Sequence, residues 1–433
     1  MRPQPLRAGR RQAGAATLVI VMALFLVMAL LAAYANRNLL FEQRIAASYA
    51  RASLSQEVAE GGIEWALAQL NGPAIDAACQ PLAVGGQRFV DRYLQVDPAD
   101  RSFRLAQPSA KTVMADCTRN RATQGWTCRC PTLPTARVVP AAAAGTDITP
   151  SFGIRLKAGS RGGTFEVFSR GCTDSVIDRC EGAGGAGAAQ RSQEQQAVNL
   201  FSSLIALVSA VRTPPAAPLV VKGNLDMTGA GLGLHNTDPR SAGALLAIGG
   251  AWTGMNDERM HSVPGTASAQ ARVQGEPTLA TRSADDVFKM FMGASANRYA
   301  QHPALRTVTC NGDCANALAA AYAAGQRILW VDGPLTIGSN KTLGAVTDPV
   351  LIIATDVILD GPFALNGMLV ARGDLAWTNT GGLTSLINGI VLVTGRMETD
   401  GSMDIVYQQA VAEQLRNRMG SFVRVPGSWM DND

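Results

Sequence analysis

Histidine is scarce in this sequence. It contains only three histidines, His235, His261 and His302, in Gly-, Pro- or Asn-rich surroundings and without the spacing of metal ligands, which favours positions in surface loops. No Walker A loop, G-x-S-x-G or H-E-x-x-H motif is present. The net charge of +4 is too small for 433 residues to indicate a nucleic-acid surface. We therefore expect a protein that is not an enzyme, holds no cofactor or metal, and does not bind nucleic acid.

Charge is also absent from a long segment near the N-terminus. No charged residue occurs from Gln12 to Ala33, and residues 15–36 form an uncharged, mostly apolar run of 22 residues. This is about the length that an α-helix needs to cross the ~30 Å hydrocarbon layer of a bilayer. Four arginines and no acidic residue precede the run, and such a flank should stay cytoplasmic under the positive-inside rule. The sequence thus predicts a single-pass membrane protein whose remaining residues face outward.

The helical pattern does not stop at the end of this run. Apolar residues continue to recur at three-, four- or seven-residue steps, among them Phe41, Ile45, Tyr49 and Leu67. The stretch 71–73 (Asn-Gly-Pro) then ends the helix by C-cap and helix-breaker chemistry. A cleaved secretory signal is disfavoured because its apolar core is shorter and unrelated sequence follows it. We predict one helix of roughly 55 residues, with a plain anchor followed by a helical stalk as the alternative.

Glycine and proline are abundant after the helix. The 44 Gly and 21 Pro, with only 17% charged residues, indicate many short strands and turns rather than helical bundles. About 360 residues follow the helix, too many for one domain at the usual ~100–200 residues per domain. We therefore expect two domains, separated at the proline-rich stretch from Thr213 to Pro218.

All eight cysteines follow the membrane run, and an even number in an exported region indicates disulfides. Cys172 with Cys180 and Cys310 with Cys314 are close enough in sequence to form local pairs. The pairing of the other four is open, and a zinc site is the alternative, although their C-x-C spacing suits tetrahedral zinc poorly. These four are Cys79, Cys117, Cys128 and Cys130.

The first exported region has few clear periodic patterns. Residues 87–96, 152–157 and 163–170 alternate enough to be strands, whereas 131–150 has the composition of a surface connection. The apolar segment 195–211 is ambiguous between strand and helix because it mixes β-branched and helix-forming residues.

A theme punctuated by glycine recurs beyond residue 218. An apolar pair, a glycine and an alternating strand follow one another in LVVKGNLDMTG, LWVDGPLTIG and VLVTGRMETDG. Such repeats predict a stacked β-solenoid in which each turn buries its apolar pair. A β-sandwich with glycine-rich turns is the alternative, because the repeat spacing is irregular. Short helices are expected at 284–292, 314–324 and 407–418, the last ending at Gly420.

Aspartates in this second region are the remaining candidates for catalysis, since β-helices can host polysaccharide-cleaving enzymes. Several lie beside glycine in expected turns, where an Asx side chain bonds its own backbone, and we therefore do not expect catalysis. Loops at 236–243 and 378–382 would suit calcium or an adhesive contact, but oxygen-rich loops are common. The aspartates are Asp332, Asp356, Asp360, Asp374 and Asp404.

The junction between the basic leader and the apolar run carries a more specific pattern. Gln12, Gly14 and Ala15 stand there without a spacer, ahead of Leu18 and Val19. This pattern resembles the class III signal of type IV pilins, and in particular the N-terminal domain of PilX-type pilus assembly proteins. The resemblance implies that prepilin peptidase cuts after Gly14 and that the new N-terminus, Ala15, is methylated. Further matches to that family are EQRIA at 42–46, AEGGIEWA at 59–66, TCRCP at 127–131, D-x-x-F-x-x-F at 285–291 and RVPGSW at 424–429.

The resemblance also implies a fold of the α+β class. A long N-terminal transmembrane pilin helix packs on an antiparallel β head, and a β-rich C-terminal domain, β-helix-like or a sandwich, follows. In this fold the ambiguous segment 195–211 is the third strand of the head. The expected divisions are a prepilin leader at 1–14, the pilin helix at 15–71 with its transmembrane part at 15–36, a pilin-like head at 72–212, and the C-terminal domain at 213–433.

One position departs from the major pilins. They carry a glutamate at the fifth mature position, which counted from Ala15 is Val19. The K-type tip pseudopilin of type II secretion systems also lacks this glutamate. We therefore expect a non-enzymatic minor pilin that takes part in initiating type IV pilus assembly, at the filament tip. The alternatives are a K-type tip pseudopilin and a membrane-anchored adhesin or glycan-binding β-domain protein.

The resemblance implies the partners and the location as well. The helix would contact other minor and major pilins, and prepilin peptidase and a tip adhesin are further partners. The protein would sit in the inner membrane of a Gram-negative bacterium, with its C-terminal domains in the periplasm, before it enters the pilus.

Overall fold

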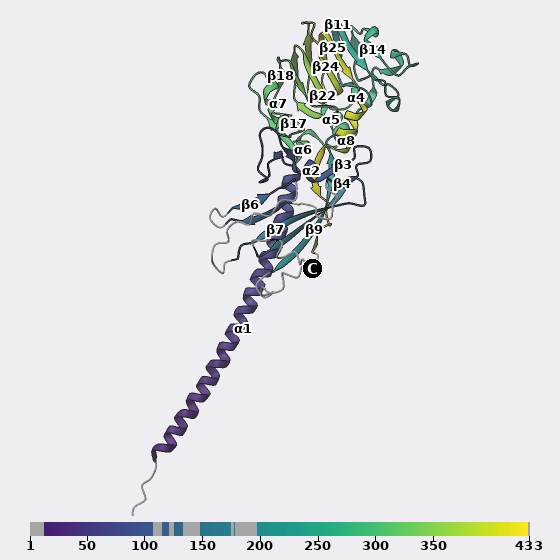
Figure 1. Cartoon of the computed structure of the whole chain (residues 1–433). Helices are drawn as coiled ribbons and strands as arrows, with labels where there is room; N and C mark the ends of the chain where they lie inside the picture. Colours follow the sequence, from purple (N-terminus) through teal and green to yellow (C-terminus); the bar gives the residue numbers. More distant parts are fainter. Residues whose placement is uncertain are drawn as a thin grey trace, which may run out of the picture.

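A computed structural model describes residues 13–106, 115–120, 125–132, 148–174, 177 and 197–431. Its three parts are a long N-terminal helix, a β head packed on the upper half of that helix, and a β-solenoid beyond the head (Figure 1). This arrangement is the α+β fold expected from the sequence, with a β-helix-like C-terminal domain.

The first helix, α1 (Ala13–Leu70), is 58 residues long, about 87 Å at 1.5 Å per residue. It ends where the sequence predicts, before the stretch 71–73 (Asn-Gly-Pro). Residues 18–50 are exposed along their whole length, and the buried residues of α1 begin at Ser55. The lower half of the helix therefore extends free of the head, whereas the upper half forms part of the head's core (Figure 1).

The head is built on a seven-stranded antiparallel sheet. Its order is β26-β9-β8-β7-β5-β6, with β27 also paired to β9. The predicted strands at 152–157 and 163–170 are confirmed. The ambiguous segment 195–211 contains a strand, β9, which is the third strand of the antiparallel meander β7-β8-β9. The bounds are β5 (Asp116–Arg119), β6 (Trp126–Arg129), β7 (Ser151–Ala158), β8 (Thr164–Cys172), β9 (Val198–Ser209), β26 (Gly420–Arg424) and β27 (Met430–Asp431).

A glycine sets the distance between α1 and this sheet. A Cβ on Gly171 of β8 would lie 2.1 Å from the backbone oxygen of Ser55 and 2.9 Å from the Cβ of Ala59. No side chain fits there, so the helix packs backbone against backbone on β8. Phe152, Phe165 and Phe201 from β7, β8 and β9 then fill the space to either side of this contact.

The prediction of one strand over 87–96 is wrong in its middle. The structure has β2 (Gln87–Arg88), a helical turn α2 (Phe89–Tyr93) and β3 (Leu94–Val96), with β1 (Ala74–Ile75) and β4 (Phe103–Leu105) as partners of the two strands. The helical turn forms because it places Phe89 and Tyr93 on one face, where Phe89 meets the ring of Trp65 edge-on at 5.8 Å. Alternation in the sequence cannot reveal that long-range contact.

The C-terminal domain is a parallel β-solenoid, so the sandwich alternative is wrong. All of the pairings between its sixteen named strands are parallel, and a β-sandwich is antiparallel. Its interior holds the apolar residues of the repeated theme. The strands are β10 (Leu219–Val221), β11 (Leu225–His235), β12 (Leu246–Ile248), β13 (Trp252–Thr253), β14 (Met260–His261), β15 (Arg272–Val273), β16 (Leu305–Val308), β17 (Ile328–Val331), β18 (Leu335–Ile337), β19 (Lys341–Leu343), β20 (Val350–Ala354), β21 (Val357–Asp360), β22 (Phe363–Ala371), β23 (Leu375–Asn379), β24 (Leu386–Val393) and β25 (Met397–Val406).

The coils do not stack in sequence order. Along one face the order is β15-β12-β10-β24-β22-β20-β17-β16, so the first strand of the domain lies beside one of the last. The chain enters in the middle of the stack, builds one end, crosses to the other end through α4 (Pro277–Thr281), α5 (Ala284–Met292) and α6 (Ala296–Tyr299), and returns coil by coil. Entry and exit are therefore neighbours, which suits a domain inserted into another.

Helices cover one face of the solenoid. Residues of α5, α6 and α8 (Gln409–Asn417) form a second apolar layer against the outer side of β20, β22 and β24. Both faces of these strands are buried, which explains why they read as continuous apolar runs. The predicted helix at 284–292 is confirmed with its bounds and its end at Gly293, and α7 (Ala315–Ala323) matches the predicted helix at 314–324 and covers one end of the interior.

After α8 the chain returns to the head. Gly420 does not merely end the helix as predicted, because it begins β26, which pairs with β9 from Ser209 to Ile205. Residues 420–431, which the sequence places in the C-terminal domain, thus complete the head sheet. The solenoid is consequently an insertion between two neighbouring strands of the head.

Candidate functional site: the free helix and its junction with the head and solenoid

The free half of α1 is the largest exposed apolar surface among the described residues. Leu18, Val19, Phe25 and Met28 are each 62–69% exposed although they are apolar. By its length and composition this apolar helix is able to span a bilayer. Gly14 and Ala15 lie in the first turn of α1, and most of the predicted leader falls outside the described residues.

The top of α1 is tied directly to the end of the chain. The Asn71 Oδ1 accepts a hydrogen bond of 2.8 Å from the backbone N–H of Phe422, and its Nδ2 donates one of 2.9 Å to the carbonyl of the same residue. About two turns lower, Arg424 Nη2 lies 2.5 Å from Glu64 Oε1. Strand β26 of the head is thereby fixed to the first helix.

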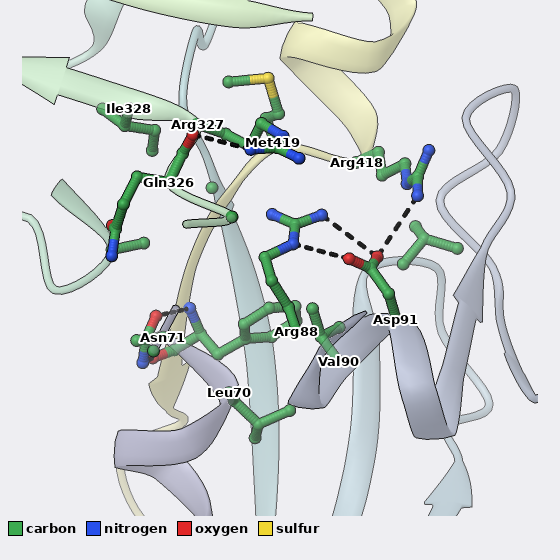
Figure 2. Close-up of a pocket in the computed structure, with 16 residues that line it drawn as sticks. Leu70, Asn71, Arg88, Val90, Asp91, Gln326, Arg327, Ile328, Arg418 and Met419 are labelled. Carbon is green, nitrogen blue, oxygen red and sulfur yellow. Dashed lines mark hydrogen bonds and ion pairs between the residues drawn. The ribbon is translucent and has the colours of Figure 1, made fainter. Parts of the chain in front are cut away.

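A polar cluster joins the head to the solenoid next to this contact. The carboxylate of Asp91 in α2 forms two ion pairs (Figure 2). One is with Arg88, just before α2, at 2.6 Å, and the other is with Arg418, which follows α8, at 3.3 Å. Burial alone would raise the pKa of the Asp91 carboxyl, but the Arg88 and Arg418 guanidinium groups outweigh it and hold that pKa below its usual value. The charged carboxylate thus links the two domains.

A second ion pair supports the cluster from the solenoid side. Arg327 binds both oxygens of Asp348, at 2.9 and 2.7 Å, and its guanidinium stacks 4.0 Å from the ring of Tyr322. A cavity of about 30 Å³ lies between Leu70, Arg88 and Met419, where the helix end, the head and the solenoid meet (Figure 2). It has room for ordered water and for little else.

His302 lies in the same junction, and its position differs from the surface loop that the sequence favours. The hydroxyl of Ser421 in β26 hydrogen bonds with its Nδ1 and also accepts from the backbone N–H of Ala304 at 2.7 Å. The imidazole stacks on Tyr299 at 5.2 Å. Burial lowers the pKa of His302 to about 4, so the ring is neutral at physiological pH.

Backbone hydrogen bonds between the segment that enters the solenoid and the segment that leaves it complete the junction. Ala210 donates to the carbonyl of Met419 at 2.8 Å, and Val211 donates to that of Leu415 at 3.3 Å. The Tyr299 hydroxyl donates to the carbonyl of Ala210 at 2.7 Å. Two adjacent chain segments therefore carry the solenoid, and they hold it more rigidly than a single flexible linker could.

Disulfides hold the loops of both domains. The four cysteines whose pairing the sequence leaves open form two bonds, Cys79–Cys130 and Cys117–Cys128, in place of a zinc site. In the solenoid, Cys310 pairs with Cys314. Cys172 is disulfide-bonded, and Cys180 lies outside the described residues.

The other two histidines are brought together although 26 positions separate them. His235 ends β11 and His261 ends β14, and the parallel register of these strands stacks the two rings at 4.9 Å. Asp404 binds His235 Nε2 at 3.0 Å and Arg259 at 2.8 Å. The sequence gives no sign of this contact, because the register that creates it is a tertiary feature. No group of three or more His, Cys, Asp or Glu placed to hold a metal occurs among the described residues.

The solenoid aspartates act on neighbouring coils. Asp356 Oδ1 accepts from the backbone N–H of Asp374 at 2.8 Å, and Asp374 Oδ1 accepts from that of Arg396 at 2.9 Å. We expected Asp374, which lies beside Gly373, to bond its own backbone, whereas both of these side chains bond the next coil. They are turn-forming residues that fix the stacking.

Comparisons with known proteins give little. No family model and no curated protein matches this chain. Among solved structures, the competence-associated pilin ComZ from Thermus thermophilus aligns over 89% of this chain and 97% of its own, with 9% identity and a TM-score of 0.21. A TM-score of this size does not establish a shared fold.

Proposed function

We propose that this chain is a non-enzymatic, pilin-like subunit of the PilX type, whose helix α1 first anchors it in the inner membrane and then packs among the helices of a filament. The observation that carries the proposal is one continuous helix with two different surfaces. Residues 18–50 are apolar or weakly amphipathic and uncovered, and the residues from Ser55 to Leu70 are built into the head. Such a subunit can move from lipid to protein neighbours without refolding.

Maturation would precede assembly. In this proposal prepilin peptidase removes residues 1–14 after Gly14, and the new N-terminal Ala15 is methylated. Val19 supports a minor subunit, because it offers no carboxylate to a neighbouring N-terminal amine. The partners would be other minor and major pilins, met through the free half of α1.

The solenoid supports a place at the filament tip during initiation of assembly. It is inserted between β9 and β26 and held by two chain segments, so it is fixed beside the head and adds bulk beyond the end of α1 (Figure 1). A repeated shaft would have to accommodate that bulk at every subunit, whereas a tip needs to do so once. A K-type tip pseudopilin has the same requirements and is the second candidate.

The first test is the mass of the N-terminal peptide from native membranes. A peptide that begins at methylated Ala15 supports the pilin route, and Gly14→Val should abolish the cut whereas Gly9→Val in the same leader should not. A peptide that begins at Met1 would instead favour an anchored adhesin. Immunolabelling of filaments then tests where the subunit lies. Label confined to the filament ends supports a position at the tip, and label along the shaft contradicts it.

A further inference from the structure

The outer face of the head sheet, turned away from α1, carries a groove of about 280 Å³. The side chains of β7, β8 and β9 alternate, and those that face α1 include Phe152, Phe165 and Phe201, so their neighbours in sequence point outward. The groove is lined by outward residues of all three strands together with part of Leu156. These residues are Gly153, Arg155, Lys157, Phe168, Arg170 and Leu200.

The groove has an apolar floor and a cationic rim. In the register of the sheet Arg170 lies between Gly153 and Leu200, and Phe168 follows two residues away on the same face. Gly153 brings no side chain of its own to the row, and Ile177 packs against it, 3.2 Å from where a Cβ would lie. Apolar surface and positive charge therefore lie within one small hollow.

Lys157 and Arg170 of the rim differ in their partners. Lys157 is paired with Glu166 at 3.1 Å, and its ammonium lies 6.0 Å from the centre of the Phe168 ring. The side chain of Arg170 has no hydrogen bond or ion pair with any residue in the described part of the chain. Its guanidinium is half-buried beside Leu200 and can still offer two parallel N–H groups to a carboxylate.

These features define the ligand chemically. A carboxylate would meet Arg170, and an apolar or aromatic group next to it would cover Phe168 and Leu200. β8 pairs on both sides, with β7 and with β9, so no backbone strand can be added here and recognition must come from side chains. A nucleic-acid strand requires a row of cations along its phosphates, and one unpaired arginine in a short groove does not supply it.

We infer that this groove binds an acidic segment of a partner protein, in which an aspartate or glutamate adjoins an aromatic side chain. The volume accommodates one or two side chains and not a folded surface. Because the groove faces away from α1, it stays accessible whether α1 is in the membrane or among other helices.

The test uses the full chain in detergent and labelled peptides with the core Asp-Phe-Asp between glycines, read by fluorescence polarisation. Two control peptides replace the core with Asn-Phe-Asn or Asp-Ala-Asp. We expect binding of the first peptide that weakens about tenfold or more with either control peptide and with Arg170→Gln. Arg104→Gln, the same change at an exposed arginine of the head outside the groove, should leave the affinity unchanged.

Several outcomes would overturn the inference. They are absence of binding by the Asp-Phe-Asp peptide at millimolar concentration, equal affinity for the Asn-Phe-Asn peptide, and an Arg170→Gln protein that binds as the wild type does. Tighter binding of an oligothymidylate than of the peptide, lost in Arg170→Gln, would assign the groove to nucleic acid instead. The peptide comparison on the wild-type protein decides the matter even if a variant does not fold.

Discussion

Asn71, directly after the first helix, and Phe422, in strand β26 of the head, are joined by two hydrogen bonds although 351 positions separate them. The amide side chain of Asn71 pairs with the backbone N–H and C=O of Phe422 as a neighbouring strand would. Since the whole solenoid lies between these residues in sequence, the contact closes the head around its insertion.

Asn71→Ala should destabilise the head. The variant leaves the N–H and C=O of Phe422 without partners in a largely buried place, which costs about 2 kcal/mol. The midpoint of thermal unfolding in detergent measures the loss. Asn316→Ala, at an exposed position of α7, is the matched control and should have no effect. Equal midpoints for the two variants would show that the contact with Phe422 contributes nothing.

Asp91→Asn should loosen the head from the solenoid. The substitution keeps the shape of the side chain but removes the charge that faces Arg88 and Arg418, at an expected cost of roughly 1–3 kcal/mol. The pKa of Asp91 is lowered in the folded protein. The folded state then binds fewer protons than the unfolded state, so this stabilisation is complete above the ordinary aspartate pKa and is lost as pH falls through the lowered value.

The pH dependence of Asp91→Asn separates this role from simple packing. Protease cleavage between the domains should increase in the variant at neutral pH, and the difference between variant and wild type should shrink in acid. A difference that is the same at pH 7 and pH 3 would contradict the role of the charge.

His302 should make the junction sensitive to mild acid. Its pKa is about 4 in the folded protein against an ordinary value of 6.5, so below pH 6.5 the unfolded state takes up a proton that the folded state does not. Stability should fall by about 3 kcal/mol between pH 6.5 and pH 4 and level off below. His302→Gln, which retains an acceptor for Ser421, should remove this slope. An unchanged slope in that variant would assign the acid sensitivity to other groups.

Gly389 should tolerate no side chain. It has φ +147°, and a Cβ there would lie 1.8 Å from the carbonyl oxygen of Gly367 in the adjacent coil. Gly389→Ala should therefore separate two coils and expose the solenoid to limited proteolysis. Gly338→Ala is the matched control, because the nearest atom to its Cβ is the carbonyl oxygen of Asp360 at 3.8 Å. Comparable protease resistance of both variants would show that the stack can adapt at this corner.

Local patterns were sufficient for several elements. The apolar run and the breaker at 71–73 fix the end of α1, and Ser283 with Gly293 fixes both ends of α5 as N-cap and C-cap. The repeated glycine theme indicated a solenoid, since each coil buries its own apolar pair. It could not exclude a sandwich, because both folds alternate inward and outward side chains, and only the parallel register distinguishes them.

The contacts that form the junction could not be predicted in the same way. Arg418, His302 and Ser421 acquire their partners from segments more than a hundred positions away. The stacking of His235 on His261 depends on the register between β11 and β14, and the sequences of the two strands do not reveal that register. The groove at Arg170 depends on which face of β8 meets α1, and the packing at Gly171 decides that.

The sequence by itself determined the membrane-length helix, the cysteine-rich region that follows it and the β character of both domains, because run length, cysteine number and residue spacing act locally. Only the tertiary structure decided that the solenoid is inserted between β9 and β26 and that its first and last coils are neighbours. The physical reason is that strand pairing in a sheet is set by long-range hydrogen bonds and side-chain packing, and any strand of suitable pattern can satisfy the same local rules.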